Sequence, residues 1–339
     1  MRGKTEAAAR ALDALGVVRA LGRLPAWHGL VVLCYHRIGD AGTSRFDRAL
    51  YSATQEELDR QVRELARHVE LVAGEDIGRA LHVRRGRHAA ITFDDGYRDN
   101  HDLAAPVLRA HGAPATFFLA TGFVGSSRAA WWDEVAWMLR TSPLDGLPPS
   151  AWCPGGLSFD GTGREDAVRA GLELCKRLPW NRTEEFLRWL EAAAGVARPG
   201  EAEVGSTWMT WDMARAMQAQ GFQFGAHTMD HPILARCSVA EQSRQVVGSI
   251  DRIEVELGER PRVFAYPVGH ASSFTEETRA CLAGAGVTVG LSFYGGWQAA
   301  GDGDPLDVRR IHVSPSISPA RFRAQLTLPR LFARRVSPP

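Results

Sequence analysis

The stretch Ala89-Ala90-Ile91-Thr92-Phe93-Asp94-Asp95-Gly96 joins an apolar run to two adjacent carboxylates. Residues 89–93 have the apolar and aromatic content of a buried strand. On a regular strand Asp94 and Asp95 would face opposite ways, but Gly96 permits a sharp bend that brings both toward one cavity. A solvent-exposed turn is the alternative, because Asp-Asp-Gly is also good turn chemistry.

A second polar segment, residues 226–232, carries His227 and His231 four positions apart. This spacing occurs in helical zinc motifs, but Thr228 stands where the general-base glutamate should be, and Pro232 disfavours helical geometry at His231. We therefore expect a pair in a loop, with two ordinary surface histidines as the alternative. One carboxylate and two imidazoles form an open three-ligand site for a divalent metal, beside which a spare carboxylate serves as a base. Together the two segments predict a metal-dependent hydrolase.

Strand and helix patterns alternate along most of the chain. Expected strands span residues 30–35, 89–93, 115–120, 222–226, 263–265 and 287–291. Expected helices begin at Thr54 or span residues 103–110, 212–220, 239–257 and 275–283. This alternation predicts an α/β fold with a parallel sheet wrapped by helices. A barrel is favoured because candidate ligands follow the strands and no glycine-rich phosphate loop follows the first strand.

Three regions of the sequence do not follow this alternation of strands and helices. Residues 1–29 are predicted to form an N-terminal amphipathic helix, and residues 326–339 a basic C-terminal tail. Within the barrel region, 30–325, residues 126–206 are predicted to form a tryptophan-rich helical insertion, whose tryptophans mostly supply its own core.

Composition excludes some classes of protein. The net charge of +1 gives no general attraction to nucleic acid, and no run of 18 apolar residues suggests a membrane span. Five scattered cysteines and the lack of a secretory signal indicate a reduced, cytoplasmic protein. The basic amphipathic ends also admit peripheral contact with an anionic membrane at its inner face. The oligomeric state stays open.

Residues 92–96 and 227–231 resemble the first two motifs of the polysaccharide deacetylase family, which shares the NodB homology domain. Further resemblance lies at residues 35–37, 211–212 and 264–269, so that it covers about 30–315 apart from the insertion. It implies a distorted (β/α) barrel of about seven strands. It also implies metal-dependent removal of acetyl groups from amino sugars.

The resemblance also implies residue roles. The implied metal ligands are Asp95, His227 and His231. Zinc is the expected ion, with cobalt, nickel, manganese or iron as alternatives. Asp94 would be the general base on the metal-bound water, and the backbone N–H of Val268 would stabilise the oxyanion. His312 would be the acid that protonates the leaving amine, unless it is a structural histidine.

Other residues are expected around the pocket, and one departs from the family pattern. The remaining pocket candidates are His36, Trp131, Trp132, Tyr266, Pro267 and Trp297. Many family members have an arginine that orients the base aspartate at the position of Ala265, and Arg309 or Arg310 is a candidate to replace it. Val268 replaces the usual aromatic residue, but a backbone contact survives that change.

The combined expectation is a deacetylase acting on an N-acetylated amino sugar of a glycan precursor, a lipid-linked saccharide or a glycosylated metabolite. An esterase or amidase for O-acetyl or other acyl groups would use the same residues. A non-haem Fe(II) oxygenase also uses two histidines and one carboxylate. A non-catalytic carbohydrate-binding protein is the third alternative, suggested by Ala265.

Overall fold

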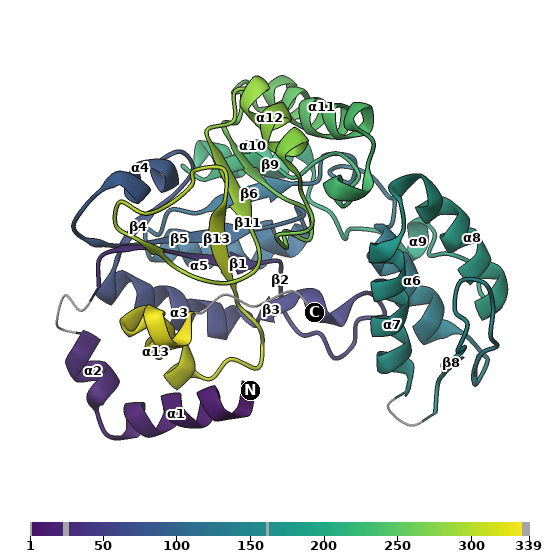
Figure 1. Cartoon of the computed structure of the whole chain (residues 1–339), viewed down its shortest axis with the longest axis horizontal. Helices are drawn as coiled ribbons and strands as arrows, with labels where there is room; N and C mark the ends of the chain where they lie inside the picture. The colour runs from purple at the N-terminus through teal and green to yellow at the C-terminus, as the bar shows by residue number, and fades with distance from the viewer. Residues whose placement is uncertain (1, 23–26, 161–162, 334–339) are drawn as a thin grey trace.

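The computed structural model describes residues 2–22, 27–160 and 163–333. Within these residues seven parallel strands close into a barrel (Figure 1), because β5 at one end of the strand order pairs back with β1. In order around the barrel the strands are β1 (Gly29–Tyr35), β13 (Val308–His312), β11 (Val289–Ser292), β10 (Val263–Ala265), β9 (Gln223–Ala226), β6 (Thr116–Leu119) and β5 (Arg87–Phe93). The barrel expected from the sequence is therefore confirmed.

The closing pair is the longest in the sheet. β1 and β5 run in register over seven residues, from Gly29 opposite Arg87 to Tyr35 opposite Phe93. Every residue of β1 is buried, as expected of an apolar strand covered on both faces. Two short strands extend the sheet beyond the ring: β4 (Glu70–Val72) lies parallel to β5, and β12 (Gln298–Ala299) lies antiparallel to β1.

Helices cover the outside of the barrel. They are α3 (Gln55–His68), α4 (Asp76–His82), α5 (Ala105–Ala110), α10 (Trp211–Ala219), α11 (Val239–Leu257) and α12 (Glu276–Gly284). A π-helical turn, Asn100–Ala104, precedes α5. The expected start of α3 is confirmed by a capping box, in which Thr54 Oγ1 accepts from the Glu57 N–H at 3.2 Å and the Glu57 carboxylate accepts from the Thr54 N–H at 2.9 Å. Small strands β2 (Arg37–Ile38) and β3 (Tyr51–Ala53) pair beside β1, with a 3-10 turn at Arg48–Leu50.

The helical insertion stands beside the barrel (Figure 1) and has its own core. Its elements are α6 (Trp131–Thr141), β7 (Gly146–Leu147), β8 (Leu157–Ser158), α7 (Gly163–Arg177), the 3-10 turn Trp180–Arg182, α8 (Thr183–Ala194) and α9 (Glu201–Val204). Phe186 is packed between Trp152 and Trp189, with both ring-centroid distances 5.6 Å. These rings fill the insertion core, as the sequence predicts for most of its tryptophans.

The chain termini differ from the sequence prediction. The expected single helix is divided at Gly16, whose φ of 73° ends α1 (Arg2–Ala14) before α2 (Val17–Gly22). The C-terminal tail expected over residues 326–339 is helical in its first part. These residues belong to α13 (Pro319–Thr327) and α14 (Pro329–Phe332), which pack on the protein because the apolar side chain of Phe332 is buried. Residues 334–339, with Arg334 and Arg335, lie outside the described residues. No helix in the described ranges is long and apolar enough to cross a bilayer.

Gly225 on β9 gives a test of the packing beneath the site. A Cβ there would lie 2.4 Å from the Phe118 ring and 2.8 Å from Val263 Cγ2, both buried. Gly225→Ala should therefore lower the free energy of unfolding by about 1–3 kcal/mol. The matched control is Gly284→Ala at the end of α12, where nothing lies within 4 Å; it should be neutral or stabilise by up to about 1 kcal/mol. Urea unfolding of both variants checks this, and equal effects would contradict the packing described.

Candidate active site

A cavity of about 270 Å³ lies at the carboxyl ends of the barrel strands, between the barrel and the insertion. Residues that follow β1, β5, β9, β10 and β11 meet there with residues of β13, α6 and α7. Its lining is His36, Asp47, Ala49, Leu50, Asp94, Asp95, Trp131, Trp132, Leu172, Lys176, His227, His231, Tyr266, Val268, His270, Phe293, Arg310 and His312. This is the end at which parallel barrels carry their active sites.

Three buried side chains converge in this cavity. Asp95 Oδ1 lies 3.5 Å from His227 Nε2 and 3.5 Å from His231 Nε2. His227 Nδ1 donates to the carbonyl oxygen of Ala265 at 2.7 Å, which leaves its Nε2 lone pair directed to the carboxylate side. Both histidines lie in a loop after β9, as the sequence predicts.

The chemistry of these donors fits a divalent cation. Asp95 Oδ1 is buried and has no hydrogen-bond partner among the described residues. Burial lowers the pKa of His227 and His231, so both imidazoles stay neutral and available as ligands. Burial, followed by the charge of Asp94, raises the pKa of Asp95, a cost that a cation would offset. Two imidazole nitrogens and one carboxylate oxygen suit first-row metals such as zinc.

The backbone is strained at the same place. In the described part of the chain four residues other than glycine have positive φ: Asp95 (76°), Thr228 (65°), His231 (54°) and Val268 (61°). Each such conformation costs on the order of 1–3 kcal/mol and requires support. Thr228 Oγ1 supplies it by accepting from the His231 N–H at 3.0 Å and donating to the His227 carbonyl at 2.5 Å. Two of the three converging residues, Asp95 and His231, are therefore held in strained backbone conformations.

Asp94 is held by a two-point ion pair. Arg310 on β13 donates from Nη1 to Asp94 Oδ1 at 2.7 Å and from Nη2 to Oδ2 at 2.8 Å, and both side chains are buried. Burial acts to raise the pKa of Asp94, but the Arg310 charge outweighs it and holds that pKa below its ordinary value. Arg310 thus takes the place of the arginine missing at Ala265. Its neighbour Arg309 instead donates to the Trp297 carbonyl at 3.1 Å.

His36 and Cys34 lie on the other side of Asp94. His36 Nε2 is 4.0 Å from Asp94 Oδ2, and the Cys34 thiol donates to the same oxygen at 3.5 Å. Burial lowers the pKa of His36 to about 3, so it is neutral, and burial raises the pKa of the Cys34 thiol. These three residues are also close enough to hold a cation. They suit one less well, because Arg310 already occupies both Asp94 oxygens and the thiol stays protonated.

The predicted acid and the residues after β10 line the same cavity. His312 lies on β13 two residues beyond Arg310 and its ring centroid is 5.4 Å from that of Phe293. Val268 is half-buried, and its strained backbone follows Tyr266. The Tyr266 hydroxyl donates to the Leu306 carbonyl at 2.8 Å, so this side chain supports the wall through a bond directed away from the cavity.

Trp131 and Trp132 bring α6 of the insertion against His231. The Trp132 ring centroid lies 4.5 Å from that of His231, and Trp132 Nε1 donates to the Tyr97 hydroxyl at 2.8 Å. Trp131 Nε1 donates to the His231 carbonyl at 3.2 Å. Both tryptophans therefore line the cavity and hold one of the three converging donors.

If the three donors bind a divalent cation such as zinc, Trp132→Leu should weaken that binding by about 10- to 100-fold, because it removes the ring that packs on His231 and the hydrogen bond to Tyr97 that holds this ring in place. Competition with a zinc-sensitive dye measures the affinity. Trp152→Leu is the matched control, since Trp152 packs against Phe186 in the insertion, outside the cavity lining. Equal zinc affinity in the two variants would show that Trp132 does not support the site.

Two predicted pocket residues lie elsewhere. Trp297 is edge-on to Trp27 at 5.9 Å, because the chain reverses at Gly295–Gly296 and carries β12 to the amino end of β1. Pro267 is buried but does not line the cavity. The structure therefore places these two residues outside the cavity lining, and their predicted contact with substrate stays a prediction.

Several lining residues have no signal in the sequence. These are Asp47, Ala49, Leu50, Leu172, Lys176, His270 and Phe293. Leu172 and Lys176 come from α7, which the insertion brings over the cavity mouth. Phe293 directly follows β11, so only an exact strand boundary would have identified it.

Solved structures with the same fold are deacetylases by name. The chain superimposes on the Streptococcus pyogenes deacetylase PplD, solved with acetate, with a TM-score of 0.57, 17% identity and coverage of 90% of this chain and 98% of that one. For IcaB from Ammonifex degensii the TM-score is 0.55 and the identity 20%, with coverage of 88% of this chain and 97% of that one. For the BpsB deacetylase domain from Bordetella bronchiseptica the TM-score is 0.52 and the identity 16%, with coverage of 85% of this chain and 97% of that one. Comparison with curated proteins found no match.

The sequence pattern of one family also matches. The model of polysaccharide deacetylases aligns with residues 83–142 and 181–290, which together make up half of the chain. The chain therefore belongs to the polysaccharide deacetylase family, as its first two motifs predict, and is a hydrolase of the deacetylase type. The segment between the two matched ranges, 143–180, contains α7 and lies within the insertion.

Proposed function

We propose that this protein is a metal-dependent hydrolase that removes the N-acetyl group from an amino sugar. The observation that carries the proposal is the convergence of Asp95, His227 and His231 beside Asp94, whose carboxylate is fixed by Arg310. Family membership supports the acyl-transfer chemistry. Zinc suits the donor set best, with cobalt, nickel, manganese or iron as alternatives.

Each residue has a defined task in this mechanism. A cation on Asp95, His227 and His231 would supply Lewis-acid polarisation and an acidified water when bound. Asp94, kept ionised by Arg310, accepts the proton of the attacking water as general base. The Val268 N–H stabilises the oxyanion, and its constrained backbone sets the direction of that donor. His312 protonates the leaving amine.

The shape of the cavity supports a sugar ligand. Trp131, Trp132 and Phe293 provide flat apolar surfaces, and Lys176 and His270 provide polar contacts at its edge. We propose a glycan precursor, a lipid-linked saccharide or a glycosylated metabolite as substrate. All five cysteines are free, which supports a cytoplasmic setting.

Mass spectrometry of acetamido sugars incubated with the zinc-loaded protein tests this function. Free, nucleotide-linked and lipid-linked sugars are compared, and loss of one acetyl mass from one class is expected. Chelation should abolish the loss and added zinc should restore it. Unchanged masses for all three classes would contradict the proposal.

Matched substrates and conditions separate the alternatives. An esterase would hydrolyse O-acetyl sugars in preference to N-acetyl sugars. An iron oxygenase would need oxygen, whereas the proposed hydrolase turns over without it. The binding-only alternative rested on Ala265, and the ion pair between Arg310 and Asp94 weakens that argument.

A further inference from the structure

The two ends of the chain fold into one unit, which we term the terminal module: α1, α2, α13 and α14 (residues 2–22 and 319–332). Its small core contains Ala9 and Val18 from the N-terminal helices with Ala324 and Phe332 from the C-terminal helices. Figure 1 shows α1 running below α13 and α2 standing to the left of α13. Segments about 300 positions apart in the sequence thus form one surface.

The sequence at both ends is strongly basic. Residues 1–22 and 313–339 contain nine Lys and Arg residues but only two acids, a formal charge of +7 against +1 for the whole chain. Both acids are paired: Glu6 accepts from Arg10 at 2.9 Å, and Asp13 accepts from Arg323 Nε at 3.0 Å. The positive charge of the molecule is therefore concentrated at its termini.

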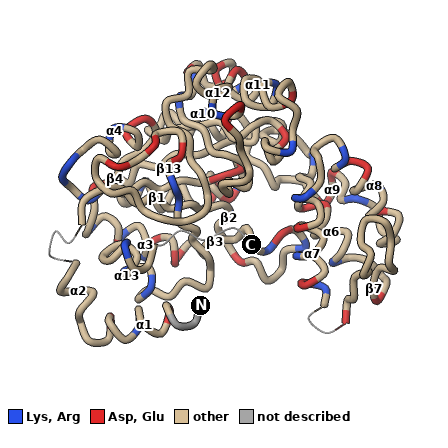
Figure 2. Tube along the Cα trace, in the orientation of Figure 1, with Lys and Arg blue, Asp and Glu red and all other residues tan. Residues whose placement is uncertain are grey.

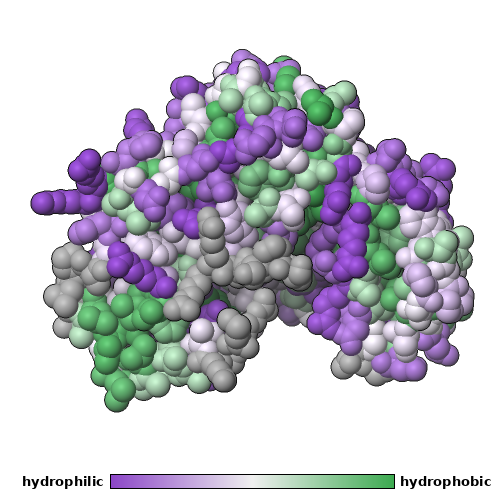
Figure 3. Space-filling model, in the orientation of Figure 1, coloured by the Kyte–Doolittle hydropathy of each residue, from purple (hydrophilic) through white to green (hydrophobic). Residues whose placement is uncertain are grey.

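Most of the residues described as exposed on the N-terminal helices are apolar. Among residues 5–14 of α1, whose exposure is described, Ala7, Ala8, Arg10, Ala11 and Ala14 are exposed, and Leu15, which follows, is 77% exposed. Figure 3 shows a continuous apolar area over α2 and the adjoining end of α1, where Figure 2 shows few charged residues. Leu331 on α14 is also exposed, at 49%. A helix in contact only with water would present a polar outer face, so this surface suits a less polar partner.

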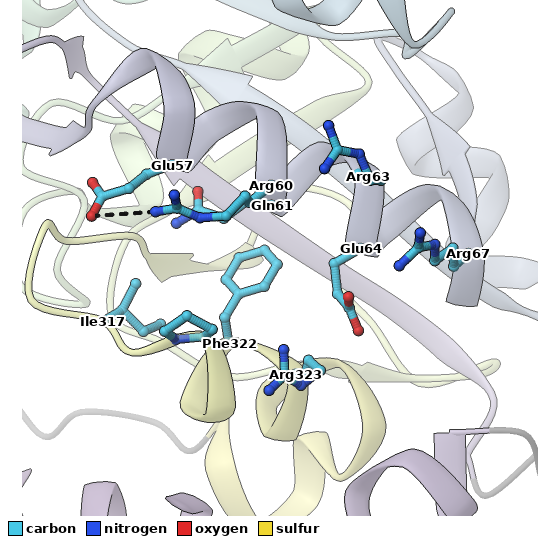
Figure 4. A pocket seen from close by; sticks show the side chains of 10 residues that line it. Glu57, Arg60, Gln61, Arg63, Glu64, Arg67, Ile317, Phe322 and Arg323 are labelled. Atoms are coloured by element: carbon cyan, nitrogen blue, oxygen red, sulfur yellow. Dashed lines mark ion pairs between the residues drawn. The ribbon is translucent and has the colours of Figure 1, made fainter. Parts of the chain in front are cut away.

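A groove between α3 and α13 adds arginines next to the terminal module (Figure 4). Arg60, Arg63 and Arg67 project from α3, and Arg323 from α13 faces them. Ile317, Pro319 and Phe322 provide apolar lining in a volume of about 200 Å³. Glu57 and Glu64 also line the groove. Arg60 lies 3.9 Å from Glu57, Arg63 lies 2.5 Å from Asp59, and Arg323 pairs with Asp13, so among the described residues Arg67 is the arginine of the groove that has no acidic partner.

From these features we propose that the terminal module docks on the surface of a bilayer that contains anionic phospholipid, together with the groove between α3 and α13, which we term the arginine groove. Exposed apolar side chains next to basic ones are what an interfacial helix presents to acyl chains and headgroups. A second copy of this chain is a poorer occupant, because it would place two strongly positive modules against each other.

Docking would hold the enzyme at the surface of the bilayer that carries lipid-linked saccharides. Among the substrates named above it favours a lipid-linked saccharide, a preference that rests on the proposed function. The docking itself does not depend on the hydrolase activity, so the two can be tested separately.

Flotation of the full chain with lipid vesicles tests the docking. Binding is expected to vesicles of phosphatidylcholine mixed with phosphatidylglycerol, with little binding to phosphatidylcholine alone and release at high salt. Arg67→Glu should weaken binding by about tenfold or more, because it replaces an attracted charge with a repelled one. Leu15→Glu should weaken it as well, by removing an apolar side chain from the interface.

The controls exchange similarly exposed residues far from the module. Val255→Glu on α11 matches Leu15→Glu, since Val255 is 79% exposed, and Arg177→Glu on α7 matches Arg67→Glu. Both controls should bind vesicles as the parent protein does, and all four variants should keep turnover on a soluble sugar. Absence of vesicle binding, equal binding to neutral and anionic vesicles, or equal loss in the controls would overturn the proposal, as would a dimer through this face in solution.

Discussion

Asp94→Asn is expected to lower turnover by about 10²- to 10⁴-fold while the protein keeps its full metal content. The amide cannot accept the proton of the attacking water. It is nearly isosteric with the carboxylate, however, and it leaves Asp95, His227 and His231 in place. Steady-state hydrolysis and metal analysis on the same sample measure the two quantities.

The adjacent residue provides the matched control. Asp95→Asn should lose metal first and turnover as a consequence, because Asp95 Oδ1 is the atom that both imidazoles approach. The proposed division of roles fails if Asp94→Asn loses its metal, or if Asp95→Asn keeps metal and loses only turnover.

Arg310→Met is expected to destabilise the protein by about 3–5 kcal/mol, because it leaves the buried Asp94 carboxylate without a partner. Without the guanidinium, nothing of similar strength offsets the burial that raises the pKa of Asp94. The base must be ionised to act, so the acid limb of kcat/KM should move to higher pH. Chemical unfolding and a pH–rate profile measure the two effects.

Two further variants separate charge from packing. Arg309→Met should have a small effect, because Arg309 lies outside the cavity lining and bonds only the Trp297 carbonyl among the partners described. Combining Arg310→Met with Asp94→Asn should recover part of the stability, since the unpaired charge is gone, but none of the activity. An unshifted acid limb in Arg310→Met would show that Arg310 does not control Asp94.

The barrel is predictable from the sequence where its strands are continuous apolar runs, as in residues 30–35 and 89–93. β13 is not, because Val308–His312 contains two arginines and a histidine and lacks that pattern. Arg310 can be buried there because Asp94, 216 positions earlier in the sequence, neutralises it. Such a pairing depends on the closed barrel and has no local signature.

Some residues of the site are likewise predictable from the sequence and others are not. The four residues Asp94, Asp95, His227 and His231 are found from sequence because each pair lies within one short segment. Lys176 reaches the cavity only through the packing of the insertion, which no periodicity encodes. Trp297 was misplaced because a short antiparallel strand, β12, takes the chain after Phe293 to the opposite end of the barrel.

X-ray absorption at the zinc edge of the zinc-loaded protein tests the central claim most directly. We expect one zinc per chain, with two imidazole nitrogens and carboxylate or water oxygens at about 2.0–2.2 Å. Asp95→Asn should lose this signal. A sulfur ligand at about 2.3 Å would place the ion on Cys34 instead, and the absence of imidazole scattering would exclude His227 and His231 as ligands; either result would contradict the account.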